Sequence, residues 1–246
     1  MIAIFAAMDT EVGACFGGST PSACSDIEGF PLYGAGDIIV CKTGIGRRSA
    51  QAVEAVLVRY SPRIALSVGV AGGLAPGNSV GDLIVCRSVD HELHRNADEV
   101  TSVICDERLV QEARETAKSL GLPVCEGSSL TVDEAAWGPD EKAAHHAWKR
   151  HDIVEMESFW IGKAAAKRDI HFLTARTISD SADHQLHQTG AMREDGTFDA
   201  AAFQTWAQAH PELMQDFAER VSDTRIAFSN LTSFLQAFLP RLQETL

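Results

Sequence analysis

The chain has 246 residues, of which 45% are hydrophobic and 22% charged, and this length and balance are typical of one large globular domain. Lysine and arginine number 21 against 34 aspartate and glutamate, so the net charge of −13 disfavours binding to nucleic-acid phosphates or to anionic lipid headgroups. No apolar run reaches the roughly 18 residues of a transmembrane helix, and the N-terminus lacks a basic segment, so we expect a soluble cytoplasmic protein.

Short apolar runs mark the predicted strands in the first third of the chain. Residues 2–7 predict a buried strand leading into a loop that carries Met8 and Glu11, and the Gly-, Ser- and Cys-rich stretch 14–29 predicts a further loop. Additional strands are expected at 38–41, 64–68 and 83–86. A helix is expected in the segment 47–61, since an apolar stripe follows Gly46 and Pro62 closes it.

The alternation of strands and helices continues in the middle of the chain. A charged amphipathic helix is predicted over 106–120, and a strand-like stretch follows from 123 to 132. Residues 153–156 (IVEM) precede a helix over 158–168, and 170–178 predict the last strand. Together these elements indicate an α/β fold, with a mostly parallel or mixed sheet covered by helices.

The last part of the chain differs in character. After Asp183 it becomes rich in Gln, His and Gly, turns at 194–196 and then reads as helical to Leu246. We therefore expect one domain, with an α/β core at 1–183 and a helical extension at 184–246. An apolar stripe at helical spacing is predicted to pack on the protein's own core or on a subunit interface rather than on lipid. It comprises Leu231, Phe234, Leu235, Phe238 and Leu242. Pro240 is expected to bend or end this helix.

Polar or glycine residues follow several predicted strands, at 8–11, at 69–73, and at 155–157 together with 176–180. Because such a sheet brings strand ends together, these segments are candidates for one site. Each also has an ordinary explanation: the glycines as a tight turn, and Asp180 as a helix N-cap. In extended geometry Glu155 and Glu157 share a face, and their apolar neighbours place at least one of them at an edge or cleft.

These segments belong to a set of motifs that keeps its order and spacing between residues 1 and 183. The set comprises Ala6–Val12 (AAMDTEV), Thr43–Gly46 (TGIG), Val68–Pro76 (VGVAGGLAP), Val80–Asp82 (VGD), Val154–Glu157 (VEME) and Arg176–Asp180 (RTISD). It resembles the motifs of the nucleoside phosphorylase and nucleosidase superfamily, especially the methylthioadenosine/S-adenosylhomocysteine nucleosidases. The resemblance implies a nucleoside phosphorylase-like fold, a small-molecule nucleoside substrate, a homodimer, and no metal or organic cofactor.

The resemblance also implies roles for residues in these motifs. Cleaving a ribosyl purine produces an anionic leaving group and a sugar with oxocarbenium character, so the site needs an acid at the base and anionic groups near the sugar. Asp180 would protonate or hydrogen-bond purine N7, with Ser179 and Arg176 positioning it. Glu11 would order the attacking water and Glu157 would bind the ribose 2′ and 3′ hydroxyls. The remaining expected contacts with substrate come from Ile45, Ala71, Gly72, Glu155 and Met156.

Either water or phosphate can be the acceptor in this superfamily. Phosphorolytic bacterial members carry an Arg and a Ser around the glycine loop, whereas Ser67 and Val70 stand at those places here. Arg47 and Arg48 follow Gly46 and could still reach an anion from the start of the helix, although an exposed helix face is the simpler explanation for both. We expect water as the acceptor, with phosphate as the alternative, and the reaction would release adenine from a 5′-modified adenine nucleoside.

The stretch that usually supplies an aromatic residue to stack on the base differs here. Ala135 stands in place of the ring, and Trp137 follows two residues later. This stretch, Glu157-Ser158 and the segment 192–199 resemble the hopanoid-associated branch more closely, whose members remove adenine from adenosylhopane. An apolar stripe beside the site could admit a long apolar 5′ substituent.

Three other functional classes remain as alternatives. The pairs His91 and His94, His145 and His146, and His184 and His187 suggest a metal enzyme, but none has a zinc-site spacing. Gly44-Ile45-Gly46 suggests a dinucleotide-binding turn, but Ser49 stands at the third glycine position. A non-catalytic nucleoside-binding protein could share the fold, although a binder does not need both Glu11 and Asp180.

Overall fold

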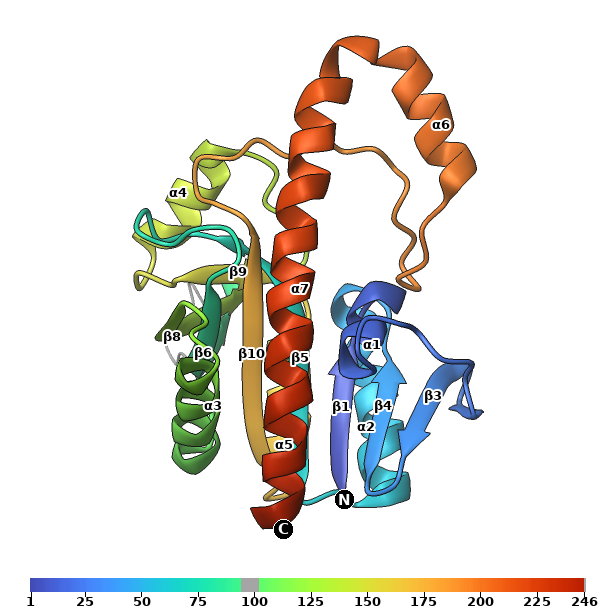
Figure 1. The fold of residues 1–246 in the computed structure, drawn as a ribbon, viewed down its shortest axis with the longest axis vertical. Helices are drawn as coiled ribbons and strands as arrows, with labels where there is room; N and C mark the ends of the chain where they lie inside the picture. Colours follow the sequence, from blue (N-terminus) through green and yellow to red (C-terminus); the bar gives the residue numbers. More distant parts are fainter. Residues whose placement is uncertain (94–101, 246) are drawn as a thin grey trace.

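A mixed β-sheet with helices on both faces forms the body of the computed structural model, which describes residues 1–93 and 102–245 (Figure 1). The strands are β1 (Ile2–Ala6), β2 (Ser25–Ile27), β3 (Phe30–Ala35), β4 (Ile38–Lys42), β5 (Ile64–Gly73), β6 (Leu83–His91), β7 (Val103–Ile104), β8 (Val124–Thr131), β9 (Ile153–Glu155) and β10 (His171–Asp180). The helices are α1 (Asp9–Cys15), α2 (Ser49–Tyr60), α3 (Glu107–Ser119), α4 (Pro139–Ala147), α5 (Ser158–Ala166), α6 (Ala200–Ala209) and α7 (Met214–Thr245). The predicted α/β class, the mixed sheet and the C-terminal helical extension are confirmed.

The helices cover the sheet in two layers. α2 and α5 pack together on one face, while α1, α3 and α7 pack on the other, and α7 crosses β10 and β5 (Figure 1). β1 lies between β4 and β5 and runs parallel to both. All five of its residues are buried, as expected for an inner strand of a sheet covered on both faces.

β5 changes partners along one of its edges. On one side it pairs in parallel with β10 over most of its length. On the other side it pairs with β1 over Ile64–Ser67 and then, in antiparallel fashion, with β9 at Gly72 and Gly73. Between these two partners, residues 68–71 of that edge pair with no strand that the structure describes. At this edge, backbone groups therefore pair with side chains instead of with a strand, at a point where open α/β sheets commonly bind ligands.

α7 contributes the apolar stripe that the sequence predicts. Leu231, Phe234, Leu235, Phe238 and Leu242 are all fully or almost fully buried and belong to the main hydrophobic core. The stripe thus packs on the protein's own core, as expected. Pro240 does not end the helix, because α7 continues to Thr245; the other form of the prediction, a bend at Pro240, stays a prediction. Proline this close to a helix end removes only the hydrogen bond to the carbonyl four residues earlier, so the helix is not terminated.

Several short elements differ from the sequence prediction. Glu11 lies in α1 rather than in a loop, and β2 occupies the end of the predicted loop 14–29. α1 has seven residues and includes Gly13, so it shows too little periodicity to be recognised. The short helix α4 was also not predicted. Residues 181–199 form no helix and contain only the isolated bridge between Met192 and Phe198, in agreement with the predicted turn at 194–196 before the helical remainder.

α6 and the first half of α7 project beyond the end of the sheet at which β1, β5 and β10 finish (Figure 1). Phe203 of α6 contacts Phe217 of α7 with ring centroids 4.7 Å apart, so aromatic side chains join the two helices. Both chain termini lie at the opposite end of the molecule (Figure 1). Among the described residues, no helix has the length and apolar character needed to cross a membrane.

Candidate active site

One pocket of about 330 Å³ at the ends of β5 and β10 brings together all of the residues that the sequence predicts for the site. They are Glu11, Ile45, Ala71, Gly72, Glu155, Met156, Glu157, Arg176, Ser179 and Asp180. These residues come from segments that are separated by up to 169 positions (180 − 11), so only the folded sheet assembles them.

Glu11 is held by the backbone at the open edge of β5. Its Oε1 accepts a hydrogen bond from Val70 N at 3.0 Å, and its Oε2 accepts from Ala7 N at 2.7 Å and Met8 N at 3.1 Å. Burial raises the pKa of Glu11, although Arg176 and these three N–H groups act in the opposite direction. A Cβ at Gly69 would lie 2.1 Å from Glu11 Oε1, so the close approach of strand and carboxylate requires glycine there.

Arg176 is the positive centre of the carboxylate cluster. Its Nη2 lies 2.9 Å from Glu155 Oε2 and 3.2 Å from Glu157 Oε2, and its Nη1 lies 3.8 Å from Glu11 Oε1. Nη1 also donates to the Val70 carbonyl at 3.2 Å. Burial lowers the pKa of Arg176, but the three carboxylates outweigh this effect and the net shift is upward. The single guanidinium of Arg176 therefore interacts with three buried carboxyl groups.

Glu155 and Glu157 have different surroundings. Glu155 accepts hydrogen bonds from Glu157 N at 2.9 Å, Ser158 N at 2.7 Å, the Ser129 hydroxyl at 3.3 Å and the Thr131 hydroxyl. Its oxygens thus fix the start of α5. Glu157 accepts from Gly46 N at 2.8 Å and from Arg176.

Glu157 has a pKa near neutral pH. Burial raises the pKa of Glu157 to about 7; Arg176 opposes the rise, and the neighbouring glutamates add to it. The two glutamates do not share an extended strand, because β9 ends at Glu155 and Glu157 precedes the first residue of α5. Both nevertheless face Arg176.

Asp180 is the last residue of β10, and it does not cap a helix, since the next described α-helix begins at Ala200. Its Oδ1 accepts a hydrogen bond from the Ser179 hydroxyl at 2.7 Å, in agreement with the predicted contact. Arg176 forms no described contact with Asp180, so that part of the prediction is wrong; the guanidinium is turned toward the glutamates instead. The cation beside Asp180 is Lys142, whose Nζ lies 2.6 Å from Oδ2.

Lys142 was missed by sequence reasoning. It lies in α4, where a lysine would ordinarily point into solvent, yet it is completely buried. The sequence does contain a pattern typical of a helix N-terminus at the start of α4. Pro139 occupies the first helical position after Gly138, and Glu141 accepts from the Gly138 backbone as in a capping box.

Apolar side chains form the other walls of the pocket. Besides Ile45 and Met156, the lining includes Met8, Val132, Leu186 and Met192. Trp137 and Ala135 both line it, so an aromatic ring is present although it is displaced by two residues from the expected position. Mostly apolar walls with a few carboxylates are typical of a site for a small organic ligand with an uncharged body.

The other cationic and metal-binding candidates do not converge on this pocket. Arg47 and Arg48 are exposed, and their guanidinium carbons lie 5.1 Å from the Trp160 and Phe30 ring centroids, respectively. In the described segments 1–93 and 102–245, no three His, Cys, Asp or Glu side chains form a group able to hold a metal ion. His94 lies outside the described residues.

Comparisons with known proteins agree on one family. A family model described as the phosphorylase superfamily matches residues 27–221. A 5′-methylthioadenosine/S-adenosylhomocysteine nucleosidase of Shewanella pealeana is 27% identical over 200 residues, covering 74% of this chain and 87% of that protein.

Solved structures have the same fold. The futalosine hydrolase of Helicobacter pylori matches with a TM-score of 0.69 at 19% identity, covering 96% of this chain and 97% of that one. The 5′-methylthioadenosine/S-adenosylhomocysteine nucleosidase of Neisseria meningitidis, in complex with methylthio-immucillin-A, matches with a TM-score of 0.68 at 17% identity and covers 97% of both chains. The expected architecture is therefore confirmed by known structures as well as by the sheet itself.

Proposed function

The chain belongs to the phosphorylase superfamily, and from this membership we propose that it is an enzyme that hydrolyses the N-glycosidic bond of a 5′-modified adenine nucleoside and releases adenine. The Shewanella relative and the Neisseria structure are named as nucleosidases for substrates of this kind. The observation that carries the proposal is the convergence of Glu11, Glu157 and Asp180 in one pocket.

The electrostatics of the pocket suit this reaction. As the glycosidic bond breaks, positive charge develops on the ribose and negative charge on the purine. Glu11, Glu155 and Glu157 outnumber the single guanidinium of Arg176, so the cluster stabilises an electron-poor sugar. Asp180, which is paired with Lys142, interacts with the departing base.

Each side chain then has a place in the reaction. Glu11 accepts the proton of the attacking water, and Glu157 binds the ribose 2′ and 3′ hydroxyls while Met156 packs against the sugar. Asp180 interacts with purine N7 and is oriented by Ser179. Further substrate contacts come from Ile45 at the ribose end and from the backbone of Ala71 and Gly72.

Water, rather than phosphate, is the proposed acceptor. A phosphate dianion needs several cationic or N–H donors, as arginines and open backbone groups provide. The sole guanidinium among the described lining residues is that of Arg176, and glutamates already surround it. Arg47 and Arg48 lie outside the lining.

The test is to incubate the purified protein with methylthioadenosine, S-adenosylhomocysteine, adenosine and inosine, each with and without phosphate, and to follow the free base by chromatography. We expect adenine from the 5′-modified nucleosides at rates independent of phosphate. Release that requires phosphate would make the protein a phosphorylase. Binding without any release, by a folded protein, would contradict the enzyme proposal.

A second candidate substrate follows from the apolar rim. Met8, Leu186 and Met192 line the pocket, and the exposed Phe198 follows Met192 in the chain. These side chains favour a nucleoside with a large apolar 5′ group, such as adenosylhopane, the substrate of the branch that the sequence resembles. Adenine release from adenosylhopane but not from methylthioadenosine would support it, whereas the reverse preference would contradict it.

The remaining proposals concern the whole protein. We treat residues 1–246 as one domain, because the family match at 27–221 includes both the core and much of the extension. A homodimer acting in the cytoplasm is proposed from the family resemblance. All six cysteines are free thiols, in keeping with a reducing compartment.

A further inference from the structure

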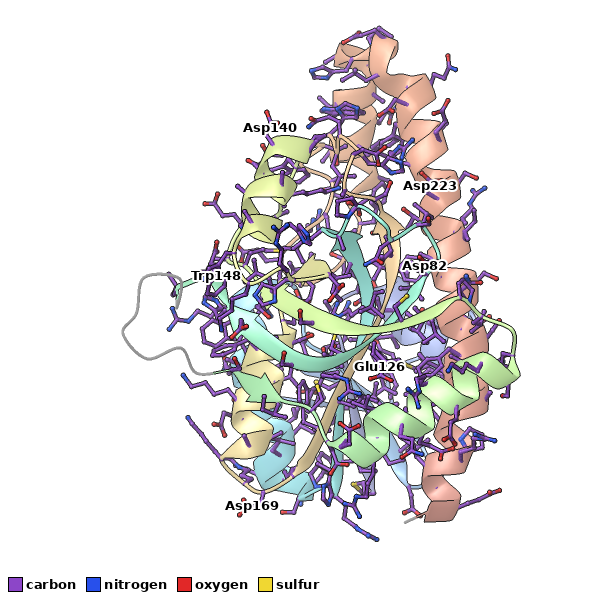
Figure 2. All side chains as sticks on the ribbon, turned by 90° about the vertical axis from the view of Figure 1, so that its left-hand side faces the viewer. Asp82, Glu126, Asp140, Trp148, Asp169 and Asp223 are labelled. Carbon is purple, nitrogen blue, oxygen red and sulfur yellow. The ribbon has the colours of Figure 1, made fainter. Side chains whose placement is uncertain are left out.

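A buried ammonium group stands behind Asp180. Lys142 projects from α4, whose two ends are marked by Asp140 and Trp148 in Figure 2. Its side chain has no exposed surface, and its Nζ lies 2.6 Å from Asp180 Oδ2. Burying a lysine is costly unless the charge is paired and hydrogen-bonded, so the contact requires an explanation.

The hydrogen bonds of Lys142 identify its charge state. Besides Asp180 Oδ2, Nζ donates to the Ser181 carbonyl at 2.8 Å and to the His184 carbonyl at 3.2 Å. With the carboxyl Oδ2 as an acceptor beside the two carbonyl oxygens, Nζ uses three N–H groups, which are the three of an ammonium. Lys142 is therefore a cation whose donors are all used by the protein. It has no donor left with which to bind substrate directly.

Of the pair, Asp180 faces the pocket, whereas Lys142 is not among the described residues that line it. Asp180 lines the pocket, and a Cβ at Gly72 would lie 3.1 Å from Asp180 Oδ2 and 3.8 Å from Lys142 Cε. The absence of a side chain at Gly72 thus gives substrate close access to the carboxylate. Oδ2 faces Lys142 and Oδ1 accepts from Ser179, so both oxygens are held in fixed directions.

We infer that Lys142 is a positioning residue for departure of the purine, acting through Asp180; this inference rests on the proposed hydrolysis. As the glycosidic bond breaks and its electron pair passes to the purine, Asp180 gives its proton to N7, and the ammonium holds and stabilises the carboxylate that this proton transfer leaves behind. Through the Ser181 and His184 carbonyls it also ties the chain after β10 to α4. The sugar and the water interact with the separate cluster of glutamates around Arg176.

Stability alone is a poor explanation for this arrangement. An apolar pair of similar volume is often as stable as a buried ion pair, or more so. A purely structural lysine would affect every substrate alike. A lysine that acts through Asp180 on the departing base affects only substrates whose leaving group interacts with Asp180.

The experiment compares two substrates that share a sugar. One is methylthioadenosine, and the other is the 4-nitrophenyl glycoside of 5-methylthioribose, which releases a stable phenolate that needs no proton. For Lys142→Met we expect kcat for methylthioadenosine to fall roughly 10- to 100-fold, below the full effect of one acid–base group, with KM little changed. The nitrophenyl glycoside should be cleaved within about threefold of the wild-type rate. Equal losses on both substrates, or no loss on either, would overturn the inference.

Two control variants define the comparison. Lys149→Met removes a lysine that also pairs with a buried aspartate, Asp90, at 3.1 Å, but neither residue lines the pocket. It should leave both rates unchanged. Glu11→Gln, by contrast, should slow both substrates, because both need the attacking water.

If Lys142→Met alone does not fold, a double variant can be compared with Asp180→Asn instead. Lys142→Met combined with Asp180→Asn leaves no unpaired buried charge, and its rate on methylthioadenosine should equal that of Asp180→Asn alone. An additional loss of tenfold or more would show that Lys142 does not act through Asp180. If the wild-type protein releases no adenine from any nucleoside, the proposed function fails. If the wild-type protein is active but Lys142→Met slows both substrates equally, only the inference about Lys142 fails.

Discussion

At the scale of single residues, three glutamates compete for one guanidinium. Arg176 lies within 4 Å of Glu11, Glu155 and Glu157, and all four side chains are buried. The cluster therefore cannot ionise fully without leaving carboxylate charge uncompensated. Of the three acids, Glu157 has a pKa raised to about 7, so its proton is lost within the physiological range.

This shift predicts the pH dependence of kcat/KM. Glu157 must be ionised to accept hydrogen bonds from two ribose hydroxyls, and its ionised fraction rises as pH increases through about 7. We expect kcat/KM for methylthioadenosine to rise between pH 6 and 8 by roughly tenfold and then to level off. In Glu157→Gln the rise should disappear, together with much of the affinity. A variant that keeps the same inflection would assign it to another group.

The two carboxylates proposed to move protons predict a second result. Glu11→Gln and Asp180→Asn should each lower kcat at least about a hundredfold, since neither amide can exchange a proton as the acid does. Glu107→Gln, an exposed change in the first turn of α3, is the matched control and should leave kcat unchanged. Steady-state kinetics with circular dichroism of each variant provides the measurement. Near wild-type rates in either site variant would refute the assigned mechanism.

At the scale of elements, the contact between β5 and α1 depends on a missing side chain. Gly69→Ala would place a Cβ 2.1 Å from Glu11 Oε1 and 2.8 Å from Arg176 Nη1. We expect a loss of about 1–3 kcal/mol in the free energy of unfolding, as in other overpacked sites, and a large decrease in kcat. Gly77→Ala is the control, because its Cβ would have no neighbour within 4 Å. Chemical denaturation and kinetics of the two variants test the difference.

Substitutions at different positions along α7 are expected to lower the free energy of unfolding by different amounts. Phe234 is fully buried and stacks on Phe238 with ring centroids 4.9 Å apart, so Phe234→Ala should lower the free energy of unfolding by about 3–5 kcal/mol. Ile226 is 48% exposed in the same helix, and Ile226→Ala should cost less than about 1 kcal/mol. Urea denaturation distinguishes the two. Equal costs would contradict the assignment of the C-terminal half of α7 to the core.

At the scale of the whole molecule, the assembly state is the prediction that rests most on family resemblance. Light scattering after size-exclusion chromatography should give the mass of two 26.5 kDa chains rather than one. Exposed apolar residues outside the core, including Val58, Ile104 and Phe198, provide surface that a partner copy can cover. A monomer mass across a wide range of protein concentrations would contradict this expectation.

Much of the core could be predicted because its signals are local. The strands that became β1, β4, β5, β6 and β10 are continuous apolar runs bounded by glycine or polar residues. The predicted site residues follow these strands, and a parallel arrangement brings strand ends together. The sequence therefore indicated which residues meet in the pocket, although not which of them touch.

The contacts that could not be predicted depend on tertiary structure. Lys142 can be buried because the chain after β10 passes close to α4, where the Ser181 and His184 carbonyls accept hydrogen bonds from its Nζ. The segment before α6 follows the same principle: Ile45 N donates to the Glu194 carbonyl at 2.8 Å, far along the chain. Gly196 approaches the Ala7 carbonyl so closely that no side chain fits there. Nothing in local periodicity encodes such meetings.

The placement of the chain ends has a practical consequence for handling the protein. The N- and C-termini lie at one end of the sheet, while the pocket opens at the other, where β5 and β10 finish (Figure 1). An affinity tag or a fusion partner at either terminus would thus be attached away from the pocket. Immobilised through such a tag, the molecule would present its pocket toward the solution, an orientation suited to ligand-binding measurements on a sensor surface.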